Sequence, residues 1–235
     1  HTYHGVVGEI AGNGVQPRFL RACERGCDRL TDGVIAISQH VAEQFEVAGI
    51  LGAGRCNVIH NGLDLNYYKG GEALARPAEL TNGPVIGTVG SLTTEKGTAD
   101  LLRAVVGLCE DNPDLTICAV GDGPLRAALE TLARQLGIAQ HVLFVGVGED
   151  VRPWIASFDG LALRSRREVM GRVLVEAMAL GGPIVATDVG GSRGAVGDAA
   201  RLAEPGNPAR LGEMLGQLLE NRGMRCQLVE AGKER

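Results

Sequence analysis

Apolar and polar residues alternate along the chain in short blocks that predict strands and helices in turn. Short apolar runs bounded by glycine or polar residues predict buried strands, and longer runs with apolar residues three and four apart predict helices. The predicted strands are residues 33–38, 85–90, 115–120, 142–145, 161–163, 184–186 and 200–203. The predicted helices are residues 19–30, 38–45, 98–109, 125–136, 151–157, 173–180 and 207–219. This alternation predicts an α/β fold with a doubly wound parallel sheet.

The stretch at residues 161–188 shows the pattern most clearly. It reads LALRSRREVMGRVLVEAMALGGPIVATD, so an apolar strand is followed by a polar loop, an apolar helix and a second strand. Gly181 and Gly182 end the helix, and Pro183 precedes the next strand. We therefore expect a parallel crossover of the kind that builds doubly wound sheets.

Two glutamates in this stretch, Glu168 in the loop and Glu176 in the helix, are separated by seven residues. A fully helical path would put them roughly 12 Å apart along the axis and about 80° apart around it, which is too far to share a metal ion or a proton. The spacing suits two acceptors that bind hydroxyl groups at opposite ends of one extended ligand. Free backbone amides near Gly171 would face an anion between them.

Composition limits the class of protein. A chain of 235 residues is long enough for one large or two small domains with a hydrophobic core, and 35 glycines fit many tight turns between strands and helices. The formal net charge of -5 argues against nucleic acid as a partner. No apolar run approaches the roughly 18 residues of a membrane span, and we expect no signal peptide.

Cysteine use indicates a reducing compartment. No paired Cys-x-x-Cys motif occurs, so buried reduced thiols are the favoured interpretation, with a metal site or a disulfide as the alternatives. This pattern predicts a cytoplasmic protein, and the lack of an Asp-x-Asp motif predicts no divalent metal site. The six cysteines are Cys23, Cys27, Cys56, Cys109, Cys118 and Cys226.

The segment SRREVMGRVLVEAMALGGPIVATDVGG resembles the signature of retaining glycosyltransferases of family 4, which have the GT-B fold and use nucleotide-diphosphate sugars. The hallmark of that family is a Glu, seven residues and a second Glu. The resemblance implies that Glu168 binds donor-sugar hydroxyls and that Glu176 binds the ribose. It covers nearly the whole chain and is most specific over residues 84–191.

The loop that follows residues 85–90 carries the next part of the resemblance. Lys96 and Gly97 match a Lys-Gly pair whose cation binds the donor phosphates, whereas Ser91 stands where the family usually has an arginine. The loss of that charge implies either weaker donor binding or compensation by another arginine. The candidates for compensation are Arg126, Arg164 and Arg166.

The resemblance also implies the remaining site residues. His4, before Gly5, matches a His-Gly pair that lies close to the donor sugar, and the loop from Val147 lies along the base. For the GDGP motif, a plain strand-to-helix turn explains the glycines as well as ligand contact does. The expected catalytic residues are Glu168, Lys96 and His4. The expected donor-binding residues are Ser91, Gly97, Gly121, Gly123, Arg126, Val147, Ser165, Met170, Gly171, Arg172, Val173 and Glu176.

The resemblance divides the chain into one complete and one partial Rossmann-like domain. We expect a partial N-terminal acceptor-side domain at 1–64, a linker at 65–82, a nucleotide-sugar-binding domain at 83–222 and a C-terminal tail at 223–235. The N-terminal part is too short to close a doubly wound sheet. It would therefore pack on the other domain, pack on another chain, or remain poorly ordered.

The function expected from the resemblance is metal-independent, retaining hexosyl transfer from a UDP- or GDP-sugar to a glycan or lipid-linked acceptor, as in polysaccharide biosynthesis. No cofactor is expected besides the nucleotide-diphosphate sugar, which is the donor substrate. The alternatives are a non-catalytic nucleotide-sugar-binding module and the donor-binding half of a transferase formed by two polypeptides. A sugar-nucleotide epimerase of the same fold fits the central pattern less well.

Four arginines concentrate positive charge in SRREVMGR: Arg164, Arg166, Arg167 and Arg172. They either attract the diphosphate or an anionic lipid-linked acceptor, or form an ordinary solvated surface. The first interpretation places the protein in the cytoplasm with peripheral contact at the inner membrane face. The expected protein partner is a second copy of the chain or a polypeptide that completes the N-terminal domain.

Overall fold

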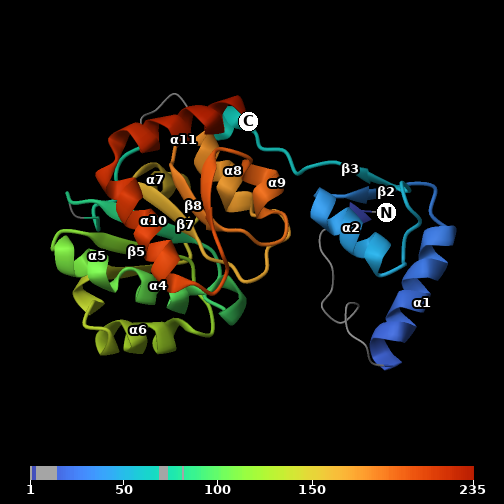
Figure 1. The fold of residues 1–235 in the computed structure, drawn as a ribbon, viewed down its shortest axis with the longest axis horizontal. Helices are drawn as coiled ribbons and strands as arrows, with labels where there is room; N and C mark the ends of the chain where they lie inside the picture. The colour runs from blue at the N-terminus through green and yellow to red at the C-terminus, as the bar shows by residue number, and fades with distance from the viewer. Residues whose placement is uncertain (1, 4–14, 69–73, 81) are drawn as a thin grey trace.

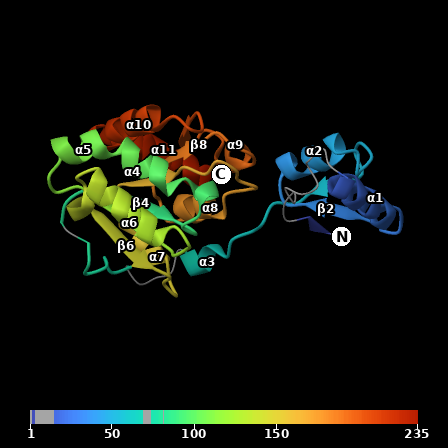
Figure 2. The same ribbon diagram turned by 90° about the horizontal axis from the view of Figure 1, so that it is seen from below.

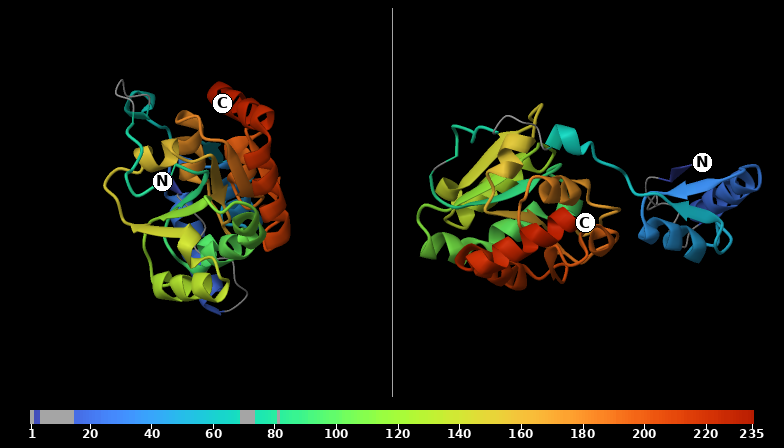
Figure 3. Two further views of the ribbon diagram at one scale, coloured as in Figure 1. Left: turned by 90° about the vertical axis from the view of Figure 1, so that its left-hand side faces the viewer. Right: turned by 90° about the horizontal axis from the view of Figure 1, so that it is seen from above.

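The computed structural model describes residues 2–3, 15–68, 74–80 and 82–235, which form two α/β units joined by an extended connection (Figure 1). We call residues 2–58 the N-terminal unit and residues 82–235 the C-terminal unit. The connection carries one short helix, α3 (Leu65–Tyr68), as seen from below in Figure 2 and from two further sides in Figure 3. No helix in the described ranges is long and apolar enough to cross a membrane.

The N-terminal unit is a small parallel sheet with its own apolar core. Among its described residues, three strands lie in the order β1-β2-β3. The hydroxyl of Ser38 caps α2 by accepting from the Val41 amide at 3.3 Å. Phe45 packs against Tyr3 in a core that also takes in Met170 of the C-terminal unit. The elements are β1 (Thr2–Tyr3), α1 (Val15–Arg29), β2 (Val34–Ala36), α2 (Gln39–Val47) and β3 (Cys56–Val58).

The C-terminal unit contains a six-stranded parallel sheet in the order β6-β5-β4-β7-β8-β9. Counted along the unit this is the order 3-2-1-4-5-6 of doubly wound sheets, in which ligands bind where the winding reverses. The reversal lies between β4 and β7, which pair directly. The strands are β4 (Val85–Val89), β5 (Thr116–Val120), β6 (Val142–Gly146), β7 (Gly160–Leu163), β8 (Ile184–Thr187) and β9 (Ala200–Ala203).

Helices cover both faces of this sheet, and each face has its own apolar core. Leu101 of α4 and Leu215 of α10 pack in one core, whereas Leu174 of α8 and Ile155 of α7 pack in the other. This burial explains the apolar periodicity of the predicted helices. The helices are α4 (Thr98–Ala104), α5 (Val106–Asp111), α6 (Arg126–Gln135), α7 (Arg152–Ala156), α8 (Arg172–Ala179), α9 (Ser192–Val196), α10 (Pro208–Glu220) and α11 (Arg222–Glu234), with 3-10 turns at Thr94–Lys96 and Ala139–His141.

The structure departs from the predicted elements in a few places. The helix predicted at 98–109 breaks at Val105 into α4 and α5, where two β-branched residues are adjacent. The predicted linker contains α3, and most of the predicted tail belongs to α11, whose Gly232 packs against Met178. The short elements β1, β3 and α9 were not predicted, because two to five residues carry too little periodicity.

The N-terminal residues pack on the C-terminal unit, which is the first of the three alternatives expected from the sequence. Besides the shared core at Met170, the Ser38 hydroxyl donates to the carbonyl oxygen of Val169 at 2.9 Å. The loop before α8 is therefore held from both units.

Candidate functional site

The candidate site lies at the carboxyl ends of β4 and β7, where the sheet reverses. The loop after β4 and the loop after β7 are joined there by a hydrogen bond from the Arg166 amide to the Glu95 carbonyl at 2.7 Å. Because both strands are parallel, their following loops meet at one edge of the sheet. This arrangement brings Lys96 and Glu168 together from segments 72 residues apart.

Lys96 and Glu168 form an ion pair. The Lys96 Nζ lies 2.7 Å from Glu168 Oε2, and both side chains are partly shielded from solvent. The Ser165 hydroxyl donates to the same carboxylate oxygen at 3.0 Å, and the Val169 amide lies 3.3 Å from Oε1. Ser165 is itself fully buried, so its hydroxyl holds the Glu168 carboxylate from the protein interior.

The start of α8 offers free backbone amides beside this pair. Gly171 precedes the helix with φ of 73°, a left-handed conformation that favours glycine, and no side chain caps the helix start. The first amides of a helix lack partners within it, so those of Arg172 and Val173 are available to an anion.

Glu176 lies inside α8 and is only 7% exposed. Its Oε1 accepts from Arg172 Nε at 3.3 Å. The pKa of the Tyr68 hydroxyl, on the connecting helix α3, is raised by burial first and by the nearby Glu176 carboxylate second. A buried carboxylate with a polar neighbourhood is suited to accept hydrogen bonds from hydroxyl groups.

The glycines of the GDGP motif are explained by backbone packing. A Cβ on Gly121 would lie 2.1 Å from the Gly90 carbonyl oxygen, and one on Gly123 would lie 2.6 Å from the Leu92 carbonyl oxygen. The Leu92 amide also donates to the Asp122 carbonyl at 3.0 Å. The motif thus locks the loop after β4 in place, and this packing requires the glycines without a ligand.

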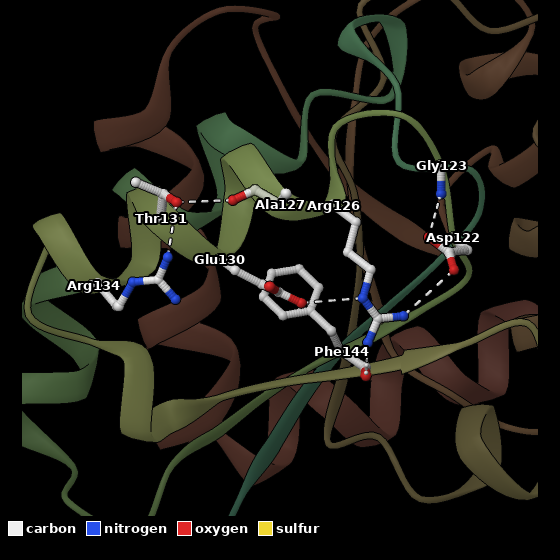
Figure 4. Close-up of polar contacts among 8 residues, drawn as sticks. All are labelled: Asp122, Gly123, Arg126, Ala127, Glu130, Thr131, Arg134 and Phe144. Carbon is white, nitrogen blue, oxygen red and sulfur yellow. Dashed lines mark hydrogen bonds and ion pairs between the residues drawn. The ribbon is translucent and has the colours of Figure 1, made fainter.

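Arg126 is fully engaged within the protein (Figure 4). Its Nε lies 3.1 Å from Glu130 Oε1, its Nη1 lies 3.5 Å from Asp122 Oδ2, and its Nη2 donates to the Phe144 carbonyl at 3.1 Å. Two carboxylates therefore balance its charge. The side chain ties α6 to β6 and holds no free charge toward the site.

The other predicted donor-binding residues fall in different surroundings. Ser91 is exposed just after β4, and Val147 is 85% exposed after β6. Met170 is 6% exposed because its side chain packs into the N-terminal core. Gly97 adopts φ of 63° directly before α4. His4, with Gly5, lies outside the described residues.

Two of the four arginines predicted to form one positive cluster are paired with carboxylates. Arg166 lies 3.1 Å from Asp100, and Arg172 lies 3.3 Å from Glu176. Arg167 is exposed, and within the described part of the chain it has no ion-pair partner. Arg164 is buried, with 2% of its surface exposed, and burial lowers its pKa to about 9.

A cavity of about 500 Å³ opens between the two units beside the Lys96–Glu168 pair. From the N-terminal unit it is lined by His40, Val41 and Gln44 of α2. Sequence analysis did not single these residues out, although the spacing of His40 and Gln44 places both on one helix face. The described residues contain no group of three or more His, Cys, Asp or Glu side chains arranged to hold a metal ion.

Comparisons with known proteins show the family and the fold of this chain. The family described as "Glycosyl transferases group 1" matches residues 72–235. The 2-deoxystreptamine glucosyltransferase of Streptomyces kanamyceticus is 30% identical over 237 residues, covering 94% of this chain and 59% of that protein. The D-inositol 3-phosphate glycosyltransferase of Corynebacterium urealyticum is 31% identical over 249 residues, covering 98% of this chain and 59% of that protein.

A solved structure, HepE of Anabaena in complex with UDP, superposes with a TM-score of 0.83 at 27% identity and covers 99% of this chain and 66% of that chain. The complex of the same protein with UDP-glucose gives a TM-score of 0.79 at 26% identity, with the same coverage. The chain therefore spans 59% of the length of these two curated relatives.

Proposed function

This chain belongs to the glycosyl transferases group 1 family and has its α/β GT-B fold, and from that premise we propose that it transfers a sugar from a nucleotide-diphosphate sugar to an acceptor hydroxyl. The observation that carries the proposal is the junction of Lys96, Glu168 and the start of α8 where the sheet reverses. This junction places a cation and free amides for a diphosphate beside a carboxylate for sugar hydroxyls. HepE, whose structure matches 99% of this chain, has been solved in complex with UDP and with UDP-glucose.

Each residue of the junction has a distinct proposed role. Lys96 balances the charge of the diphosphate, which develops further as the leaving group departs. Glu168 accepts hydrogen bonds from the sugar, and the amides of Arg172 and Val173 bind phosphate oxygens. Glu176 accepts hydrogen bonds from the ribose hydroxyls.

We propose that the reaction retains the anomeric configuration, as in retaining enzymes of family 4. The acceptor oxygen bonds to the anomeric carbon while the bond from that carbon to the β-phosphate oxygen breaks. The acceptor proton passes to the departing phosphate, on the same face of the sugar. Lys96 and the α8 amides stabilise the negative charge left on the diphosphate, so the site needs neither a metal ion nor a cofactor for this step.

For the donor we propose UDP-glucose, with GDP-sugars as the alternative class. For the acceptor, the names of the relatives suggest a ring polyol such as 2-deoxystreptamine or D-inositol 3-phosphate. A glycan or lipid-linked hydroxyl is the broader class. The cavity between the units, lined by His40 and Gln44 opposite Glu168, is where the acceptor would lie.

The test is turnover of UDP-glucose and GDP-mannose with these acceptors, in buffer containing EDTA, with the product's anomeric configuration read from its proton NMR coupling. We expect UDP release that depends on the acceptor, and a product with the donor's α configuration. Loss of activity on chelation would overturn the metal-independent mechanism. Nucleotide binding without transfer or hydrolysis of any donor would favour the non-catalytic binding module instead.

A further inference from the structure

Arg164 is a buried cation without a counter-ion. It follows β7 directly and is 2% exposed. Its Nη1 donates to the Thr88 hydroxyl of β4, and its Nη2 donates to the Thr98 hydroxyl of α4. Its Nε is buried without a partner. A guanidinium held by two neutral hydroxyls keeps its full positive charge inside the protein, which is unfavourable without a nearby anion.

The nearest acidic group does not balance this charge. Asp100 acts on Arg164 through its charge, but its carboxylate is already shared by two exposed arginines. Arg166 lies 3.1 Å from it and Arg103 lies 3.5 Å from it. The region around Arg164 thus carries a net positive charge.

The position of Arg164 connects it to the diphosphate end of the site. A Cβ on Gly97 would lie 2.5 Å from the Arg164 carbonyl oxygen, so the Arg164 backbone lies directly behind the loop that carries Lys96. Thr98 is two residues beyond Lys96 in the same segment. Each hydroxyl that accepts from Arg164 keeps its own hydrogen to donate onward. Arg164 therefore supports the loop after β4 through its contacts with Thr88, Thr98 and the backbone at Gly97.

The other two arginines considered from the sequence are already balanced. Arg126 contacts the carboxylates of Asp122 and Glu130, and Arg166 contacts that of Asp100. Arg164 alone of the three has no carboxylate partner among the described residues.

We propose that Arg164 is a positioning residue for the donor diphosphate, whose negative charge balances the buried guanidinium when the donor binds at the ends of β4 and β7. It acts through the electrostatic field and through Thr88, Thr98 and the Gly97 loop, without direct contact with the donor. In this way it supplies the positive charge that Ser91 does not. The inference rests on the proposed function, because it assumes that a diphosphate binds at this edge of the sheet.

The experiment compares the binding of UDP and uridine by protein NMR titration, which also measures weak affinities. In Arg164→Gln, which keeps a polar amide group with one donor nitrogen but loses the charge, we expect UDP affinity to fall by about tenfold or more and uridine affinity to stay unchanged. Arg164→Lys should keep UDP affinity within about threefold of the wild type. The control Arg134→Gln removes an exposed charge bonded to Thr131 on α6 and should change neither affinity.

Two further readouts separate a charge effect from a structural one. Adding Ser91→Arg to Arg164→Gln places a cation at the exposed end of β4, and it should restore most of the UDP affinity. Without nucleotide, Arg164→Gln should melt at or above the wild-type temperature, because an unbalanced buried charge has been removed. A structural residue would give a lower melting temperature and equal losses of UDP and uridine binding, which would overturn the inference.

An unchanged ratio of UDP to uridine affinity in Arg164→Gln would also overturn it. If Arg164→Gln does not fold, Arg164→Lys is the deciding variant. A folded Arg164→Lys protein that has lost the preference for UDP over uridine would contradict a role for the charge. These failures are distinct from failure of the proposed function. If the proposed function were wrong, the wild-type protein itself would bind UDP no better than uridine.

Discussion

At the residue scale, the central feature is the ion pair of Lys96 and Glu168, whose charges balance each other at 2.7 Å. A donor diphosphate bound as proposed would compete with Glu168 for Lys96, and donor-sugar hydroxyls would then take up the hydrogen-bonding capacity that Glu168 loses. The ion pair thus holds both side chains close to the proposed donor site. On donor binding, each side chain would exchange its partner in the pair for a group of the donor.

This exchange predicts different effects for the two residues of the pair. Lys96→Met should weaken UDP binding by about tenfold to a hundredfold, because a charge-assisted contact with phosphate is lost. Glu168→Gln should leave UDP binding unchanged or stronger, since Lys96 is released, while the gain in affinity from UDP to UDP-glucose disappears. Calorimetric titration of both variants with both ligands checks this, and equal weakening of UDP by the two substitutions would contradict it.

The cysteines give a second prediction at this scale. Burial raises the pKa of Cys109 to about 11 and that of Cys118 to about 12, whereas Cys226 is exposed. The two buried thiols should therefore resist iodoacetamide at pH 8 in the folded protein, while the exposed thiols of Cys23, Cys27 and Cys226 react. Peptide mass spectrometry after brief labelling measures this. Cys118 modified as fast as Cys226 would refute the burial argument.

The raised pKa values of Cys109 and Cys118 also make the stability of the folded protein depend on pH. A thiol whose pKa is raised on folding stabilises the folded state below its unfolded pKa of about 8.5, and this contribution is lost as pH rises toward the folded value. The free energy of unfolding should therefore fall between about pH 9 and pH 12 through Cys109 and Cys118.

At the element scale, the start of α8 depends on the backbone of Gly171. Its φ of 73° is unfavourable for any residue with a Cβ, and an added Cβ would lie 2.7 Å from Cδ1 of Leu174 and 3.5 Å from Cγ of Glu168. A residue with a Cβ would be strained where the loop after β7 turns into α8 next to Glu168.

Gly171→Ala should lower the free energy of unfolding by roughly 1–2 kcal/mol, from the left-handed conformation alone, with a further loss from the contact with Leu174. The matched control is Gly107→Ala in α5, where an added Cβ meets no atom within 4 Å. It should be neutral or stabilise by roughly 0.5–1 kcal/mol, because alanine is the better helix former. Urea unfolding of both variants tests this, and equal stabilities would count against the proposed backbone strain.

Most of the sheet and its major helices could be predicted from the sequence, because each buries an apolar face with a regular period. The elements not predicted are short, and at least one of them is held by contacts distant in sequence. The helix α3 is such a case, since Arg152 stacks 3.7 Å from the centre of the Tyr67 ring and donates to its carbonyl oxygen. A four-residue helix held in this way leaves no period in the sequence.

At the scale of the whole molecule, the site is built from segments of both units. The family resemblance singled out Lys96 and Glu168 separately, but it could not show that the two form an ion pair. The burial of Arg164 could not be predicted, because an arginine in a polar loop is normally exposed. Nor could the sequence place His40 and Gln44 beside Glu168, because that contact depends on how the two units pack.

The packing of the units also links the N-terminal unit to the start of α8. Ser38 caps α2 and donates to the Val169 carbonyl, and the neighbouring Met170 lies in the N-terminal core. The residues between Glu168 and Gly171 are thus held by the N-terminal unit, so an acceptor bound in the cavity and a donor bound at β4 and β7 would share this short segment.

The most direct test of the central claim, a donor site at the reversal of the sheet, is a calorimetric titration of the chain with UDP, GDP and ADP, repeated with Glu176→Ala. The account predicts selective binding of UDP that weakens by about tenfold to a hundredfold in the variant, since a buried carboxylate would no longer accept from the ribose. Binding of no nucleotide, or UDP binding that the variant leaves unchanged, would contradict it.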